Sequence, residues 1–365
     1  YINVCLKIAN ETNDHMGGKT IIFSGDIKQL PPVSTSNTSS ISPLLNSFYS
    51  TPLFTDSFKL ELNLNNRIKD NEPHKDQYLS FLNELRQHST TDFKIPSFLN
   101  KSSDSNDLIS SIYDEEYLKR YTQYRLEFDF EQLLNYFSKS QIITPTNANA
   151  NILNDQALIH FSNNISQQPI IEVSAYDYYL NPNEDTLTPL NSPLESQVLN
   201  QNDLPPSTLK LSVGAPILIT RNLNPKMKIS NGTKMIIKKI SKNVIQAVYD
   251  FMGKPTNFDI PRIEFKNDFL ALPNVLIRKQ FPIKLAFAST VHKSQGLSIE
   301  NLGIDLTSPI FAHGQAYVAF SRASSIKNIH LLFNNDQNTN NQNDPNAETF
   351  SINNISFDIS DIEVN

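Results

Sequence analysis

Three polar residues, far apart along the chain, have side chains suited to a phosphate group. Gln29 lies in GDIKQLPPV (25–33), directly after the apolar run IIFS (21–24). An amide at the end of a buried strand can hydrogen-bond a terminal phosphate or its attacking water, and the two prolines stiffen the loop. Arg67 and Arg322 carry permanently charged, planar guanidinium groups that fit phosphate oxygens. The alternative for each is an ordinary turn or surface residue.

A second segment, TVHKSQG (290–296), combines small and cationic donors that suit a DNA phosphate backbone. Its donors are Thr290, His292, Lys293 and Ser294. Gly296 permits a close approach of the backbone, for example to a nucleotide. The alternative is a solvated surface segment, because a single His-Lys pair is common on protein surfaces.

The sequence GGKT (17–20) resembles part of a phosphate loop, but it does not fit the whole pattern. The pattern G-x-x-x-x-G-K-[ST] requires a glycine five residues before Gly18, and Asn13 stands there. A phosphate loop also follows a strand and opens a helix, whereas this segment precedes the expected strand. We therefore interpret GGKT as a turn that enters the strand at Ile21.

The composition sets limits on the class of protein. The chain has 365 residues, 39% of them hydrophobic, which allows two or three domains with their own cores. Its net charge is −6, so any surface for nucleic acid must be a local one. The single cysteine, Cys5, cannot form an internal disulfide, which favours a reducing compartment such as the cytosol or nucleus. No run approaches the roughly 20 apolar residues of a membrane span.

Local patterns predict several elements in the first half of the chain. The start, YINVCLKIAN, is typical of a helix interior, so we expect the chain to be incomplete at this end. Apolar residues at i, i+3, i+4 and i+7 predict amphipathic helices at 74–88 and from Phe130 onward. Residues 100–111 are polar and indicate a loop. QIIT (141–144) indicates a buried strand, and a helix capped by Thr146 or Asn147 follows it.

The second half combines strands with irregular segments. Residues 163–208 are rich in Asn, Pro and Ser, and we expect them to be irregular. The subsequent strand patterns, at 216–220, 234–240 and 243–249, are separated by turn residues such as Asn231-Gly232, which suggests a small barrel. A further strand is expected at 284–289. The Asn-rich residues 334–365 are expected to be disordered.

Longer segments around these residues resemble the Pif-type (petite integration frequency) DNA helicases of superfamily I, in particular the branch found in helitron-like elements. The resemblance covers roughly residues 1–333. The matching segments, in the order of the family, are GDIKQLPPV, LNLNNRIKDN, IITPTNANANILN, LKLSVGAPILITRNLNP, NGTKMIIKKI, IPRIEF, RKQFPIKLAFASTVHKSQGLSIENLGIDL and HGQAYVAFSRASS.

This resemblance implies an α/β fold: the end of a first RecA-like lobe, then a second RecA-like P-loop NTPase lobe that carries an inserted small Src-homology-three-type β-barrel. The implied domains are the C-terminal part of the first lobe (1–70), a helical connection (71–140), the start of the second lobe with an irregular insertion (141–212), the barrel (213–283), the end of the second lobe (284–333) and a disordered tail (334–365).

The resemblance also assigns roles to individual residues. It implies that Gln29 is a phosphate sensor and that Arg67 and Arg322 are catalytic arginines. The residues expected to contact ATP are Asp26, Gln29, Arg67, Gln295, Gly296 and Arg322. The residues expected near single-stranded DNA are Thr144, Asn147, Thr290, His292 and Lys293. No metal ligand is expected within this chain.

The implied activity is 5′ to 3′ unwinding of DNA driven by ATP and Mg²⁺, in repair, recombination, or telomere or mobile-element replication. The family's phosphate loop and acidic pair should lie upstream of residue 1, so the chain alone is expected to be inactive. The expected partners are single-stranded DNA and duplex junctions, with no membrane, in the nucleus or alternatively the mitochondrion. The oligomeric state stays open. Two alternatives also stay open: an inactive transposon-derived remnant, and a non-catalytic module that binds single-stranded DNA.

Overall fold

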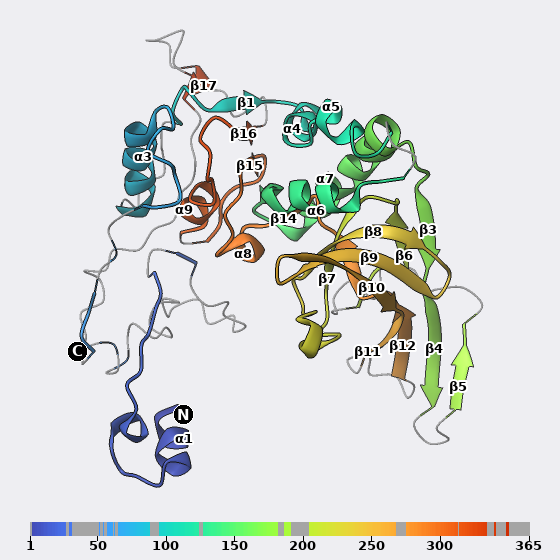
Figure 1. Ribbon diagram of the computed structural model, residues 1–365, viewed down its shortest axis with the longest axis horizontal. Coiled ribbons are helices and arrows are strands. Elements are labelled where there is room, and N and C mark those ends of the chain that lie inside the picture. Colours follow the sequence, from blue (N-terminus) through green and yellow to red (C-terminus); the bar gives the residue numbers. More distant parts are fainter. Residues whose placement is uncertain are drawn as a thin grey trace.

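The computed structural model describes residues 2–26, 29–30, 51, 54, 57–60, 62, 65–87, 95–123, 127–181, 186–190, 204–267, 275–312, 314–333, 339–340 and 348–349. Figure 1 shows an α/β lobe at the top, an all-β domain at the lower right and an N-terminal segment at the lower left. Among the described residues, no helix is long and apolar enough to cross a membrane.

A five-stranded sheet forms the centre of the lobe, and all its strand pairs are parallel. Its strands, in spatial order, are β1 (Asn100–Ser102), β16 (Ile329–Leu332), β15 (Asn301–Asp305), β2 (Ser140–Thr144) and β14 (Ala288–Thr290). A parallel sheet is normally covered on both faces. Accordingly Ile142 packs into one hydrophobic cluster and its neighbour Ile143 into another.

Helices cover both faces of this sheet. One cluster takes residues from α3 (Lys75–Gln87), α8 (Val291–Ser294) and α9 (Gln315–Phe320). The opposite cluster takes residues from α4 (Ser105–Ile112), α5 (Glu115–Lys119), α6 (Phe130–Lys139), α7 (Asn147–His160) and the π-helix η3 (Phe161–Ser166). Side chains cap four of these helices at their first turn, namely Asp104, Asp114, Asp129 and Thr146.

The β domain comprises the strands between 171 and 285. One sheet has the order β10 (Lys254–Pro261), β9 (Val244–Phe251), β8 (Lys234–Ile240), β7 (Pro216–Ile219) and β13 (Ile283–Leu285). A second has the order β11 (Ile263–Asn267), β12 (Val275–Gln280), β4 (Tyr176–Asn181) and β5 (Thr186–Pro189), and β3 (Ile171–Ser174) pairs with β6 (Thr208–Leu211). The short η4 (Pro225–Met227) lies between β7 and β8.

The N-terminal segment differs from expectation. Helix α1 (Ile2–Ala9) and the turn η1 (His15–Gly18) are present, which confirms the helix and the turn reading of GGKT. Gly17 has φ +64°, and a Cβ there would meet the Leu6 carbonyl oxygen at 2.4 Å, so a glycine is required for packing against α1.

The predicted buried strand at 21–24 was wrong: these residues form no strand, and Ile22 is 88% exposed. The reason is that no described strand pairs with them.

Two other predictions were wrong. Residues 100–111 are not a loop, because they contain β1 and most of α4. The expected irregular segment 163–208 contains β3, β4 and β5, and β4 pairs with β12, which follows almost 100 residues later. Such non-local pairing leaves little trace in the local sequence.

The remaining expectations about elements have mixed outcomes. The helices at 74–88 and from Phe130, the strands near 141, 216, 234 and 244, and the Asn231-Gly232 turn are confirmed. The strand expected at 284–289 is split into β13 and β14, which belong to different sheets. The prolines after Gln29 and most of the tail lie outside the described residues, apart from the short β17 (Thr339–Asn340) and β18 (Glu348–Thr349).

Candidate functional site

Arg67 and Arg322 meet at one residue, Ser321. Arg67 donates from Nη1 to the carbonyl oxygen of Ser321 and from Nε to the hydroxyl of Ser298 at 3.0 Å. Arg322 donates from Nη2 to the hydroxyl of Ser321 at 2.8 Å and from Nε to the carbonyl oxygen of Val318 at 3.0 Å. The two guanidinium groups, which lie far apart in the sequence, are therefore held in fixed orientations at the C-terminal end of α9.

The electrostatic surroundings of Arg322 favour an anion. The pKa of Arg322 is lowered to about 10, mainly by burial and in smaller part by the positive charge of Arg67. Tyr317 and Asp26 act in the opposite direction but do not compensate. Two cations held close together in a partly buried position are stabilised by a negative group placed between them.

Gln29 joins this cluster through Gln295. The Gln295 side-chain amide donates to Gln29 Oε1 at 3.1 Å, and the Gln29 amide donates to Asp26 Oδ2 at 3.3 Å. Asp26 also forms an ion pair with Arg86 at 3.5 Å. The N-terminal segment therefore reaches the lobe by a chain of polar contacts that ends at α3 on one side and directly after α8 on the other.

The hydroxyl of Tyr317 is close enough to four charged side chains for their charges to change its pKa. Burial and the carboxylate of Asp26 raise the pKa of its hydroxyl, and three arginines lower it, namely Arg86, Arg322 and Arg67. Tyr317 thus lies in the same site as the arginines and Asp26, where its hydroxyl can serve as a neutral donor or acceptor.

The core beneath the cluster fixes α9, the helix that precedes Arg322. The buried hydroxyl of Tyr78 donates to the carbonyl oxygen of Phe320 at 2.8 Å. Phe81 packs edge to face against Phe320 with ring centroids 5.1 Å apart. Val318 and Phe320 are fully buried. Because α3 and α9 share this core, the backbone around Ser321 has little freedom to move.

Gly296 provides open space beside the cluster. Its φ is +87°, a conformation that favours glycine, and no heavy atom lies within 4 Å of the position that a Cβ would occupy. The backbone directly after Gln295 therefore has room for a close approach of another group.

The residues predicted to lie near DNA gather at the ends of two neighbouring strands. Thr144 ends β2 and Thr290 ends β14, and the two are register partners in the parallel pair. Both are buried, and the hydroxyl of Thr144 donates to the carbonyl oxygen of Thr146 at 2.8 Å. Ligands of open α/β sheets bind at the carboxyl ends of the strands, which is where these threonines lie.

The three other predicted DNA contacts follow those strand ends. Asn147 begins α7 and is exposed, and Lys293 in α8 is also exposed. His292 is half-buried, and burial lowers the pKa of its imidazole. The four-residue helix α8 therefore has His292 and Lys293 within it and Gln295 directly after it, so it joins the two predicted sets of residues.

The donors in the cluster fit a phosphate better than a metal ion. Two arginines and a glutamine amide supply N–H groups, which suit the oxygens of an ATP phosphate. Mg²⁺ requires oxygen ligands, and the one carboxylate in the cluster, Asp26, is paired with Arg86. Across the described ranges, no group of three or more His, Cys, Asp or Glu residues could hold a metal ion.

Sequence reasoning missed four members of the cluster: Arg86, Ser298, Tyr317 and Ser321. Arg86 lies at the end of a helix that was recognised only by its apolar face. Tyr317 is five positions before Arg322 in the segment AYVAFSRA, and this shared segment was the one sequence feature that pointed to Tyr317 as a member of the cluster. Ser298 and Ser321 carry no distinctive pattern, and only the fold reveals their contacts.

Comparisons with known proteins agree on one family. A model of the "DNA helicase Pif1, 2B domain" matches residues 196–240. The ATP-dependent DNA helicase Pif1 of Campylobacter jejuni is 29% identical over 329 residues, which cover 86% of this chain and 62% of that protein. The chain therefore spans about three fifths of the length of this relative.

Solved structures of the family share the fold. The crystal structure of Pif1 helicase from Candida albicans has a TM-score of 0.56 at 20% sequence identity. The aligned region covers 91% of this chain and 67% of the Candida chain. The crystal structure of Bacteroides Pif1 bound to ssDNA has a TM-score of 0.55 at 22% sequence identity, and the aligned region covers 90% of this chain and 66% of the Bacteroides chain. Together with the α/β lobe and the order of the motifs, these similarities support a Pif1-type helicase of superfamily I.

Proposed function

We propose that this chain is the phosphate-sensing and DNA-gripping portion of an ATP-dependent helicase that moves 5′ to 3′ on single-stranded DNA. In this proposal the terminal phosphate of ATP lies between Arg67 and Arg322, next to Gln29. After hydrolysis, release of the cleaved phosphate removes the negative charge between the arginines, and α8 links the resulting movement of Gln295 to His292 and Lys293.

One observation carries this proposal: two arginines and the Gln29–Gln295 hydrogen bond converge on the end of α9 and the start of the loop after α8. Phosphoryl transfer develops charge on the phosphate oxygens, and a fixed arginine stabilises that charge strongly. Without a ligand, the position of Arg67 next to the buried Arg322 is unfavourable, since the positive charge of Arg67 lowers the pKa of Arg322.

The finer parts of the proposal rest on the family resemblance. They are the helitron-like branch, Mg²⁺ held by residues upstream of Tyr1, the identity of the β domain as a Src-homology-three-type barrel, a role in repair or recombination, and a nuclear location. The 365 residues contain no G-x-x-x-x-G-K-[ST] pattern, so the phosphate loop would have to be supplied by preceding sequence.

The test compares the 365-residue chain with a longer form that includes the preceding coding sequence. We expect the 365-residue chain to hydrolyse no ATP above background with single-stranded DNA, and the longer form to hydrolyse ATP and unwind a duplex with a 5′ single-stranded tail. Clear ATP turnover by the 365 residues would contradict the proposal.

The alternatives predict other outcomes. A non-catalytic binding module binds single-stranded DNA with an affinity that ATP does not change in either form. A transposon-derived remnant lacks a phosphate loop in the preceding coding sequence, and its longer form is inactive as well.

A further inference from the structure

Gln315 joins the start of α9 to the end of β2. Its side chain is completely buried, and its amide nitrogen donates to the carbonyl oxygen of Pro145 at 3.2 Å. Pro145 lies directly after Thr144 and two residues before Asn147, which are both predicted DNA contacts. Gln315 therefore holds the backbone of a segment expected to bind DNA, without being one of the predicted contacts itself.

A side-chain amide suits this position because it donates and accepts at the same time. The Gln315 side-chain oxygen accepts from the backbone N–H groups of Phe311 and Ala312, at 3.0 and 3.3 Å. The carbonyl of Pro145 requires a donor, whereas these two N–H groups require an acceptor. Because a buried polar group without a partner is costly, Gln315 holds the two loops together.

The core of the lobe fixes α9, so Gln315 acts from a rigid base. Ala316, Val318 and Phe320 are buried in the hydrophobic cluster that α9 shares with α3. The carbonyl of Phe320 is bound in addition by the buried hydroxyl of Tyr78. A helix anchored along its whole length keeps the side chain at its first residue in one place.

Asn149 holds the same segment from the other side. Thr146 caps α7 at the backbone N–H of Asn149, and the Asn149 amide donates to Asp305 Oδ2 at 2.8 Å. Asp305 is buried at the end of β15. The segment between β2 and α7 is thus tied to α9 by Gln315 and to β15 by Asn149, while Asn147 stays exposed.

We propose that Gln315 is a positioning residue for single-stranded DNA bound at residues 144–147, and that α9 links this DNA to the arginine cluster. α9 has six residues and ends next to Ser321, whose hydroxyl accepts from Arg322 at 2.8 Å. A shift of residues 144–147 on DNA binding is therefore passed through Gln315 to the end of the helix that holds Arg322. The inference rests on the proposed function and extends it, because it names the side chain that connects the DNA segment to α9.

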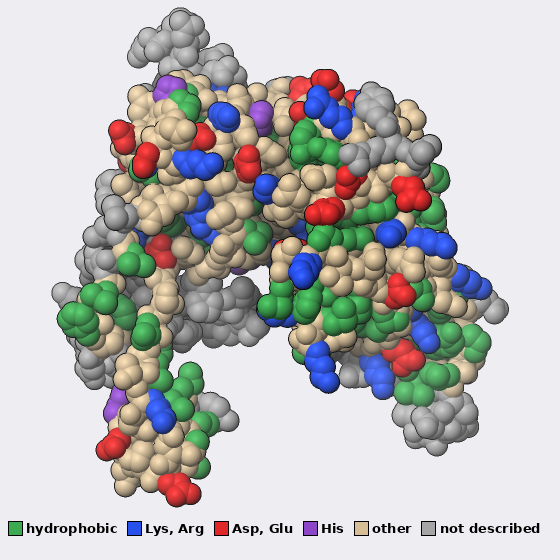
Figure 2. Space-filling model, viewed as in Figure 1, with side chains coloured by type: hydrophobic (Ala, Val, Ile, Leu, Met, Phe, Trp, Pro, Cys, Tyr) green, Lys and Arg blue, Asp and Glu red, His purple; other side chains and the backbone are tan. Residues whose placement is uncertain are grey.

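The positive charge of the β domain supplies a background of DNA binding. Residues 204–267 contain eleven Lys and Arg against three Asp and Glu, a net charge of +8 on a chain whose total is −6. Figure 2 shows several blue side chains over the β domain at the lower right. Such charge binds a nucleic-acid backbone independently of sequence. The test therefore follows local changes within the lobe instead of affinity alone.

Hydrogen exchange of the 365-residue chain, with and without an oligothymidylate, monitors both ends of the proposed connection. In the wild type, DNA should slow amide exchange at residues 146–150 and also at 316–322, by about fivefold at 316–322, which is the effect of one hydrogen bond. Helix α4, on the opposite face of the lobe sheet, is the reference and should change less. Slowing at 146–150 without slowing at 316–322, or equal slowing of α4, overturns the inference.

Variants of Gln315 test its role directly. Gln315→Met removes the amide, so DNA should still slow exchange at residues 146–150 but no longer at 316–322. Gln315→Glu retains an acceptor but lacks the donor for Pro145, and it should give the same result. Gln246→Met, which replaces an exposed glutamine of β9, is the matched control and should behave as the wild type. A folded Gln315 variant that keeps the wild-type slowing at 316–322 overturns the inference.

Failure of the proposed function gives a different result. If DNA slows no exchange at residues 146–150 of the wild-type chain, DNA does not bind at this edge of the sheet, and the proposed function is contradicted. Slowing at 146–150 alone leaves DNA binding intact and removes only the role of Gln315. If neither Gln315 variant folds, the wild-type measurement decides.

Discussion

Gln29 and Gln295 are 266 residues apart in the sequence, and their side-chain amides are hydrogen-bonded at 3.1 Å. Gln29 belongs to the N-terminal segment, and Gln295 follows α8, the helix that contains two of the predicted DNA contacts. This bond is a direct connection between the segment expected to sense a phosphate and the segment expected to grip DNA.

Replacing either glutamine should weaken that connection. In the longer, active form, Gln29→Ala and Gln295→Ala should each reduce the DNA-stimulated rate of ATP hydrolysis by roughly fivefold, which corresponds to the net value of about 1 kcal/mol for one hydrogen bond. The double variant should be no slower than the slower single variant, since both substitutions remove the same bond.

Steady-state ATPase rates with saturating DNA check this prediction, and Gln246→Ala, which removes an exposed glutamine of β9, is the control. If the effects of the two substitutions multiply, the bond between Gln29 and Gln295 does not couple the segments.

Much of the lobe could be predicted from the sequence because its signals are local. The helix α3 follows from apolar residues spaced one turn apart, and α7 follows from its N-cap Thr146 after the buried strand β2. β8 begins and ends at the predicted residues 234 and 240. In each case the information lies within about a dozen neighbouring residues.

The parts that escaped prediction depend on distant partners. β4, in a stretch read as irregular, exists because β12 pairs with it. The run at 21–24 has the composition of a buried strand, but composition alone does not form a strand where no described strand pairs with it. In the candidate site, the motifs pointed to Arg67 and Arg322, whereas their shared partner Ser321 became visible only in the fold.

Breaking the buried ion pair between Arg278 and Asp177 should strongly destabilise the β domain. Arg278 donates to both carboxylate oxygens of Asp177, at 2.9 and 2.8 Å, and both side chains are almost fully buried. Removing one partner leaves an uncompensated buried charge, so Arg278→Met should lower the free energy of unfolding by about 3–5 kcal/mol.

Chemical denaturation of the wild type and of Arg278→Met measures this decrease in the free energy of unfolding. The exposed pair of Arg120 and Glu116 is the control, and Arg120→Met should cost less than about 1 kcal/mol. Adding Asp177→Leu to Arg278→Met should recover part of the stability, because no buried charge then remains. A cost for Arg278→Met as small as for Arg120→Met would show that an unpaired Asp177 does not destabilise the β domain.

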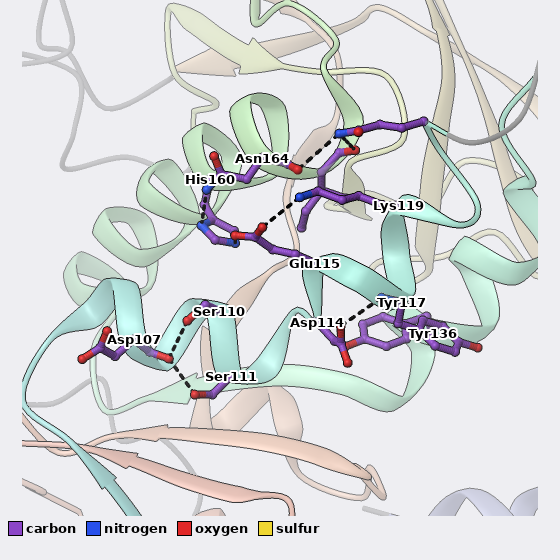
Figure 3. Close-up of polar contacts among 12 residues, drawn as sticks. Asp107, Ser110, Ser111, Asp114, Glu115, Tyr117, Lys119, Tyr136, His160 and Asn164 are labelled. Atoms are coloured by element: carbon purple, nitrogen blue, oxygen red, sulfur yellow. Dashed lines mark hydrogen bonds and ion pairs between the residues drawn. The ribbon is translucent and has the colours of Figure 1, made fainter.

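His160 should make the lobe less stable in acid. Figure 3 shows its ring between Glu115 and Asn164, with ring nitrogens 3.4 Å from the carboxylate and 3.1 Å from the amide. Burial lowers the pKa of His160, and Lys119 adds to this effect while Glu115 opposes it. The unfolded chain therefore takes up this proton first as the pH falls through about 6.5, so stability is present above that pH and is lost below it.

The measurement is the free energy of unfolding between pH 7.5 and 5 for the wild type and for His160→Gln. The variant should lose less stability over this interval than the wild type does. The same substitution at the exposed His15 should leave the pH dependence unchanged. Parallel curves for wild type and His160→Gln would contradict this assignment.

ATP hydrolysis by Arg322→Ala in the longer form tests the central claim most directly, with binding of ATP and of single-stranded DNA measured on the same protein. The account predicts that hydrolysis falls at least about a thousandfold, as for loss of a catalytic arginine, while both binding affinities stay within a few-fold of the wild type. Arg120→Ala, which removes an exposed arginine, should hydrolyse ATP normally. Unchanged hydrolysis by Arg322→Ala would contradict the claim that this arginine contacts the phosphate.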